Sequence, residues 1–180
     1  MRIIAGEWRG RKLIAPKGDT TRPTADRTRE TLFSMLVSRI GDFAGLSVLD
    51  LFAGSGALGL EALSRGAGHC LFVEQEPDAL KALRTNVDSL AERGTADVRD
   101  ASVMALGPAQ RTYDLILLDP PYGSGAGEVA LDRLARLGWV GAQSWIAVET
   151  GAKEEIAVKG FIIDVERVVG KAKLTLLRLA

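Results

Sequence analysis

One stretch of the sequence, "VLDLFAGSGALGLEAL" at residues 48–63, limits the possible folds most strongly. An apolar run ends in a loop with the spacing G-x-G-x-x-G, and an apolar helical pattern follows at once. Glycines allow a tight turn and bring backbone amides close to a ligand, while the N-terminus of the following helix favours negative charge. This succession of strand, loop and helix predicts the first unit of an α/β fold.

The rest of the chain from residue 46 alternates between buried runs and amphipathic runs, which indicates a parallel sheet with crossover connections. The few residues around "VVGKAK" are too short for a crossover and predict an antiparallel pair. We predict strands at 46–51, 69–74, 95–99, 114–119, 144–149, 161–168 and 173–179, and helices at 25–40, 57–65, 77–92 and 127–137. The expected fold is α/β and Rossmann-like, with a seven-stranded, mostly parallel sheet whose last strand is antiparallel.

The first 39 residues are basic, with nine Arg and Lys against four Asp and Glu, although the whole chain has a net charge of zero. The runs "RII" and "KLIAP" flank a glycine-containing segment, which predicts a small β-hairpin or a pair of short strands. We therefore expect an N-terminal basic β-hairpin extension at 1–22 and the main domain at 23–180. A basic extension suggests that one face meets a polyanion, although a solvated charged segment would have the same composition.

Composition narrows the class of protein further. A chain of 180 residues with 47% apolar and 26% charged residues is typical of one globular domain. No apolar run approaches the roughly 18 to 20 residues that span a bilayer, so we expect a cytoplasmic protein. A single cysteine, Cys70, beside a single histidine, His69, provides no set of metal ligands.

Three carboxylates accompany the glycine loop and indicate the kind of cofactor. Glu74 ends the strand after the loop, where a carboxylate can bind two ribose hydroxyls. Asp50 precedes the loop and could neutralise the sulfonium and ammonium groups of S-adenosylmethionine, which favours this cofactor over a dinucleotide. Asp100 could reach the adenine amino group, although it could also cap a loop.

A second stretch, "YDLILLDPPYGSG" at residues 113–125, ends an apolar strand on a carboxylate. Two prolines fix their φ angles and donate no amide hydrogen, so the nearby carbonyl groups are stiffly oriented acceptors. The Asp119 carboxylate and the Pro120 carbonyl could accept hydrogens from the exocyclic amino group of a nucleobase. Tyr122 offers an aromatic face on which an extruded base could stack. The alternative is a proline-rich turn with a partly buried tyrosine.

"DPPY" resembles the signature of amino-group methyltransferases, and "DLFAGSG" resembles their cofactor motif. The segments "RIIAGEWRGRKL", "RPTADRTRETLFSML", "LDLFAGSGALGLEALSRGA", "FVE" and "LDPPY", in this order and spacing, are similar to the RsmD family. The resemblance covers nearly the whole chain. It implies the fold of class I S-adenosylmethionine-dependent methyltransferases and methyl transfer to the N2 amino group of a guanine in 16S ribosomal RNA of the small subunit.

The resemblance also implies roles for individual residues. Cofactor contacts are expected at Asp50, Phe52, Ala53, Gly54, Ser55, Gly56, Glu74, Gln75, Asp100 and Ala101. The catalytic residues at the target amine are expected to be Asp119, Pro120, Pro121 and Tyr122. RNA phosphates are expected at Arg9, Arg11, Lys12, Arg22 and Arg27. We expect a monomer without metal or membrane contact, acting on an assembling small ribosomal subunit.

Three other functions are compatible with parts of the sequence. The same chemistry could act on adenine or cytosine in DNA or another RNA, or on a glutamine side chain. The basic N-terminal segment favours nucleic acid over a protein acceptor. The glycine spacing also occurs in nicotinamide-dependent oxidoreductases, but that function leaves "DPPY" unexplained. A module that only binds RNA would not need the methyl-transfer residues.

Overall fold

The computed structural model of this chain describes residues 1–18 and 23–180. The helices are α1 (Pro23–Ile40), α2 (Ala57–Ser64), α3 (Pro77–Leu90) and α4 (Ala126–Arg136), with a short 3-10 helix at Val103–Ala105. The strands are β1 (Ser47–Leu51), β2 (His69–Glu74), β3 (Ala96–Asp100), β4 (Tyr113–Leu118), β5 (Val140–Gly151), β6 (Phe161–Val169) and β7 (Ala172–Leu179).

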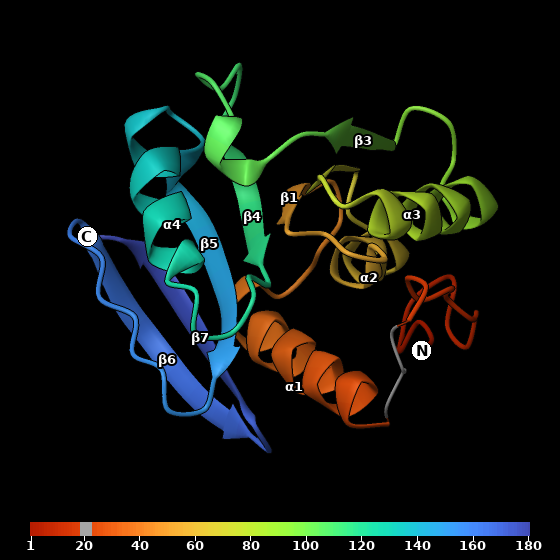
Figure 1. Ribbon diagram of the computed structural model, residues 1–180, viewed down its shortest axis with the longest axis horizontal. Helices are drawn as coiled ribbons and strands as arrows, with labels where there is room; N and C mark the ends of the chain where they lie inside the picture. The colour runs from red at the N-terminus through yellow and green to blue at the C-terminus, as the bar shows by residue number, and fades with distance from the viewer. Residues whose placement is uncertain (19–22) are drawn as a thin grey trace.

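The strands form one seven-stranded sheet in the order β3-β2-β1-β4-β5-β7-β6 (Figure 1). Neighbouring strands from β3 to β5 pair in parallel, and β7 pairs antiparallel with both β5 and β6. The predicted Rossmann-like α/β fold with an antiparallel last strand is confirmed. The strand order reverses between β1 and β4, which is where open α/β sheets bind ligands at the carboxyl ends of their strands.

Helices cover both faces of this sheet because its central strands are apolar on both sides. On one face, Phe33 of α1, Leu60 of α2 and Leu83 of α3 join a buried cluster with Val48 of β1. On the other face, Leu131 of α4 belongs to a second cluster, which contains Leu49 and Leu51 of β1. The two clusters hold β1 and β4 rigidly in the centre, so the residues at the carboxyl ends of these strands have fixed positions.

The fifth strand is longer than the sequence predicted. It extends through Gly151 because residues 146–151 pair with β7, a partner that is distant in the sequence. Glu149 therefore lies within a paired strand rather than at its last position.

The N-terminal segment reverses direction as predicted, but it contains a single antiparallel bridge, between Arg2 and Lys12, instead of two paired strands. The amide of Ile3 donates to the Arg11 carbonyl at 2.9 Å, and the amide of Leu13 donates to the Met1 carbonyl at 2.9 Å. The segment packs beside α2 and α3 (Figure 1). None of the described helices is both long enough and apolar enough to cross a membrane.

Candidate active site

The loop after β1 has an unusual backbone at its start. Phe52 has a φ of 58°, the only positive value for a non-glycine residue among those the structure describes. Gly54 and Gly56 also have positive φ, at 58° and 86°. The Ala53 amide donates to the Val73 carbonyl at 3.1 Å, which ties this bend to β2. A strained, well-tied conformation of this kind is typical of backbone that is shaped for a ligand.

The glycines of this loop serve different purposes. No heavy atom lies within 4 Å of a Cβ built on Gly54, so this residue is needed for its backbone angle and leaves open space beside it. A Cβ on Gly59 would lie 2.4 Å from Cε1 of Phe72, and one on Gly56 would lie 2.5 Å from Cδ1 of Leu83. Gly56 and Gly59 therefore allow α2 to pack closely against β2 and α3.

Glu74, predicted to bind the ribose, is held in place by backbone amides. Its Oε1 accepts from the Gly54 amide at 2.7 Å, and its Oε2 accepts from the amides of Gln75 and Glu76 at 2.8 and 2.9 Å. Asp100 is its register partner on β3, and its carboxylate is exposed. The Ala101 amide donates to the Glu74 carbonyl at 3.0 Å. The structure thus brings these predicted cofactor residues together at the ends of β2 and β3.

Asp50 lies beneath the loop and is 1% exposed. Its Oδ2 accepts from the Gly59 amide at 2.9 Å, but its buried Oδ1 has no hydrogen-bond partner among the described residues. Burial raises the pKa of Asp50 to about 8, against the lowering effect of the Gly59 hydrogen bond, and the nearby charge of Glu74 raises it further. A cationic ligand near this carboxyl would favour its ionised form.

A cavity of about 850 Å³ lies in front of the glycine loop. Part of its wall is the loop segment 52–55, and Asp119, Tyr122 and Glu149 also line it. The structure therefore joins the predicted cofactor loop to the predicted catalytic corner in one space. Asp50, Glu74 and Asp100 do not line this cavity: Asp50 lies below the loop, and the other two lie at the ends of β2 and β3.

The "DPPY" corner follows β4 directly. The Asp119 amide donates to the Leu51 carbonyl at 3.4 Å, which fixes Asp119 beside the end of β1. Asp119 is exposed as a residue and lines the cavity, while loss of hydration among the neighbouring groups raises the pKa of its carboxyl well above the usual range. The nearby carboxyl of Glu149 and the charge of Asp50 raise the pKa of Asp119 further. Pro120 is buried, and Pro121 is exposed.

Tyr122 is 50% exposed and donates its hydroxyl to Oε2 of Glu149 at 2.8 Å. Loss of hydration and the charge of Glu149 raise the pKa of its phenol, so it stays neutral and keeps this donor. The sequence prediction missed Glu149. A usable signal was present, because "WIAVET" also ends an apolar run on a carboxylate, as "LILLD" does.

The predicted RNA-binding cations do not form one cluster. Arg27 of α1 is exposed and lines the cavity. Arg9, Arg11 and Lys12 are exposed on the N-terminal segment and do not line it. Arg22 lies outside the described residues. Lys171, which follows β6 and was not predicted, is exposed and lines the cavity.

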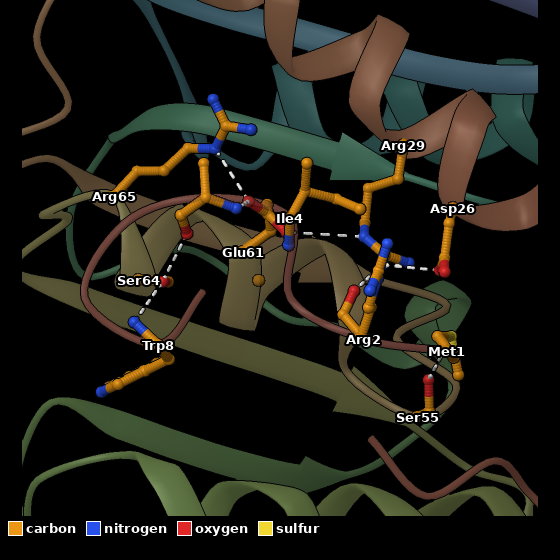
Figure 2. Close-up of polar contacts among 12 residues, drawn as sticks. Met1, Arg2, Ile4, Trp8, Asp26, Arg29, Ser55, Glu61, Ser64 and Arg65 are labelled. Carbon is orange, nitrogen blue, oxygen red and sulfur yellow. Dashed lines mark hydrogen bonds and ion pairs between the residues drawn. The ribbon is translucent and has the colours of Figure 1, made fainter. Parts of the chain in front are cut away.

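The N-terminal segment is held on α2 by a buried carboxylate, as Figure 2 shows. Glu61 is 0% exposed and accepts from the amides of Ile4 and Ala5 at 2.8 and 3.0 Å. Arg65 donates to the same carboxylate at 2.9 Å, and Nε of Arg29 lies 3.6 Å from it. Arg29 also bonds Asp26 and the Arg2 carbonyl.

The docked segment also reaches the cavity. Met1 lines it, and Oγ of Ser55 lies 3.8 Å from the Met1 sulfur (Figure 2). Trp8 and Arg11, at the tip of the segment where the chain reverses direction, lie away from the cavity. The Trp8 amide donates to Oγ of Ser64 at the end of α2, and Arg11 donates to the Ser89 carbonyl near the end of α3. These contacts place the tip at the helix ends opposite the glycine loop.

Within the described part of the chain, no group of three or more His, Cys, Asp or Glu side chains could hold a metal ion. Among the described residues, the titratable side chains that line the cavity are Asp119, Glu149, Tyr122, Arg27, Arg29 and Lys171.

Comparison with known proteins agrees with this geometry. The family model described as "Conserved hypothetical protein 95" matches residues 1–178. The chain is 40% identical over 151 residues to "Ribosomal RNA small subunit methyltransferase D" of Escherichia coli (strain K12), with 83% of this chain and 74% of that protein covered. A protein of the same name from Haemophilus influenzae is 38% identical over 154 residues, covering 83% of this chain and 78% of that protein.

Solved structures show the same likeness. The structure of yhhF from Escherichia coli superposes with a TM-score of 0.85 at 36% identity and covers 99% of this chain and 97% of that chain. A magnesium protoporphyrin IX methyltransferase from Synechocystis PCC 6803, solved with bound S-adenosylmethionine, has a TM-score of 0.70 at 15% identity, with 91% and 87% coverage. At that identity the second comparison concerns the fold alone.

Proposed function

This chain belongs to the family described as Conserved hypothetical protein 95, the RsmD family, and from that premise we propose that it is an S-adenosylmethionine-dependent ribosomal RNA methyltransferase. The proposed acceptor is the exocyclic N2 amino group of a guanine in 16S ribosomal RNA. The names of the relatives from Escherichia coli and Haemophilus influenzae support ribosomal RNA as the substrate class. The meeting of the glycine loop and the "DPPY" corner in one cavity supports methyl transfer to an amine.

The residues around the glycine loop fit S-adenosylmethionine. When bound, this cofactor supplies an electrophilic methyl group: the amine lone pair forms the new carbon–nitrogen bond, and the electrons of the carbon–sulfur bond stay on sulfur. Asp50 has an unpartnered buried oxygen that a cationic donor would satisfy. Glu74 and Asp100 are the candidates for the ribose and the adenine amino group. A pyrophosphate would bring no cation to the Asp50 carboxyl and would leave its buried oxygen unpartnered, which favours the sulfonium cofactor over a dinucleotide.

The "DPPY" corner would hold the target amine. Asp119 and the Pro120 carbonyl are the acceptors for the amino hydrogens, and Tyr122 provides the stacking face. Accepting these hydrogen bonds orients the nitrogen lone pair toward the methyl group, so positioning supplies much of the rate. The proton released from nitrogen passes to the Asp119 carboxylate.

Positive charge at the cavity would hold the RNA. Arg27 on α1 and Lys171 after β6 are exposed and line the same cavity as the carboxyls of the catalytic corner. We assign these two side chains to the phosphates that flank the methylated nucleotide, with Arg9, Arg11, Lys12 and Arg22 contacting more distant RNA. A ribosomal substrate implies a cytoplasmic enzyme, and we propose that it acts as a monomer on an assembling subunit.

Transfer of a labelled methyl group tests this function. The purified protein should methylate small-subunit particles from cells that lack it, and digestion of their RNA should yield N2-methylguanosine. Asp119→Ala should lose this activity while its affinity for S-adenosylhomocysteine stays within a few-fold. Preferential labelling of adenine or cytosine in duplex DNA would favour the alternative acceptor. Calorimetric binding of NAD but not S-adenosylhomocysteine would contradict the assignment of the cofactor.

A further inference from the structure

We propose that Glu149 is a positioning residue of the transfer site, which acts on the target amine through its two neighbours, Asp119 and Tyr122. The inference rests on the proposed function. Glu149 comes from β5, a strand that carries neither the glycine loop nor the "DPPY" corner. It would link the group that accepts the amine hydrogens to the ring on which the base stacks.

The sheet itself brings Glu149 to this place. Leu118 of β4 and Val148 of β5 are register partners, so Asp119 and Glu149 are the next residues along two adjacent parallel strands. Both carboxyls line the cavity, as does Tyr122. Because β5 continues to Gly151, Glu149 pairs with Leu174 of β7, and this pairing fixes its backbone. The Glu149 side chain therefore cannot leave the site unless the pairing of β5 with β7 is broken.

The contact with Tyr122 prepares a surface for the base. Tyr122 lies on an exposed turn, and a half-exposed ring without a partner would change rotamer freely. The 2.8 Å bond to Glu149 fixes the ring at its far end. The backbone of the same turn is held by Glu154, whose Oε1 accepts from the Gly123 amide at 2.8 Å. The ring is therefore ordered before a base arrives, which lowers the entropy cost of stacking.

The position of Glu149 beside Asp119 influences the ionisation of the Asp119 carboxyl. Two adjacent carboxyls resist losing both protons, because the second charge would form beside the first. The other groups around Asp119 act in both directions. Asp50 of β1 adds negative charge when it is ionised, Tyr122 stays neutral, and the cations Arg27 and Lys171 line the same cavity. The charge of Glu149 thus favours the protonated form of Asp119 and raises the pKa of Asp119.

Two variants separate these effects. Glu149→Gln keeps an oxygen that can accept from Tyr122 but removes the charge beside Asp119. Its KM for RNA should stay within about threefold of the wild-type value, while the acidic limb of its kcat/KM profile should move to lower pH by about one unit. Tyr122→Phe keeps the ring and the charge but loses the bond, so its KM for RNA should rise roughly fivefold with an unshifted limb.

The matched control is Glu92→Gln, which removes one carboxylate from the exposed segment between α3 and β3. Its pH profile and KM should coincide with those of the wild-type enzyme. Coincidence of the Glu149→Gln profile with the wild-type profile would overturn the proposal. Urea denaturation of each variant identifies any loss of folding. If Glu149→Gln folds poorly, Tyr122→Phe becomes the deciding variant. An unchanged KM for RNA in Tyr122→Phe would then overturn the proposed role of Glu149.

A measurement without turnover distinguishes this proposal from the proposed function. The titration of the Asp119 carboxyl carbon by NMR should move to lower pH in Glu149→Gln. If the titration moves but no RNA is methylated, the coupling stands and the proposed function fails. If wild-type protein methylates RNA but the Asp119 titration is the same in both proteins, the proposed function stands and the role of Glu149 fails.

Discussion

The Asp50 carboxyl is almost completely buried, and its raised pKa makes the stability of the folded protein depend on pH. Burial raises its pKa to about 8. The folded protein therefore holds this proton more tightly than the unfolded chain, where an aspartate has its ordinary pKa of 3.8. Stability from this group is complete below the unfolded pKa and is lost as the pH rises toward the folded value.

We predict that Asp50→Asn weakens the pH dependence of folding. Wild-type protein should lose unfolding free energy between pH 5 and pH 8, because the buried Asp50 has a pKa of about 8 in the folded protein. The Asn variant should lose less over the same range, since its amide oxygen still accepts from Gly59 but no longer titrates. Urea denaturation at the two pH values measures the difference. Equal losses in both proteins would show that Asp50 is ionised in the free protein.

Some site residues could be found from the sequence, and others could not, for physical reasons. Asp119 and Glu74 each end an apolar run, so their place at the carboxyl edge follows from the α/β pattern. Glu149 also ends such a run, but its role depends on its bond to Tyr122 and on its place beside Asp119, which the register of β4 and β5 sets. The position of Lys171 at the cavity depends on the turn between β6 and β7, which sequence periodicity does not orient.

At the scale of elements, α2 has two roles. Its N-terminus supports the glycine loop, and its buried Glu61 holds the N-terminal segment through two backbone amides. A buried carboxylate is stable only when it is paired, and here Arg65 and Arg29 supply the charge. The sequence predicted a β-hairpin in this segment, but its conformation comes from bonds to α2 and α3 that local patterns do not reveal.

We predict that Glu61→Ala destabilises the protein by about 3 to 5 kcal/mol, because it leaves the Ile4 and Ala5 amides without their acceptor and removes a buried charge partner of Arg29 and Arg65. Glu30→Ala, on an exposed position of α1, should change the unfolding free energy by less than about 0.5 kcal/mol. Denaturation in urea measures both. Limited proteolysis should also show faster cleavage within residues 1–18 of the Glu61 variant. Resistance equal to wild type would mean that other contacts hold the segment.

At the scale of the whole molecule, positive charge is divided between two regions. Arg27 and Lys171 lie at the cavity, whereas Arg9 and Arg11 lie on a segment whose tip is docked at the ends of α2 and α3. The sequence predicted one basic surface for RNA. Charge counts along the chain could not show that the structure divides these side chains between two regions, because they carry no information about direction in space.

We predict that the two regions act differently on RNA. Arg27→Gln with Lys171→Gln should lower kcat/KM and flatten the salt dependence of binding by roughly one unit of slope per charge removed. Arg9→Gln with Arg11→Gln should weaken RNA binding but leave the rate at saturation unchanged. Arg93→Gln, exposed between α3 and β3, is the control for net charge. Equal effects of the two pairs on the saturated rate would contradict this division.

The position of β7 has a consequence for the order in which the chain can fold. β7 follows β6 in the chain, yet it lies between β5 and β6 in the sheet, and its Leu174, Thr175 and Leu176 are 0% exposed. During synthesis from the N-terminus, the edge of β5 stays open until residues 172–179 have left the ribosomal tunnel. The nascent chain thus presents an apolar, unpaired strand edge, a target for chaperones, while the half of the sheet that carries the glycine loop can already fold.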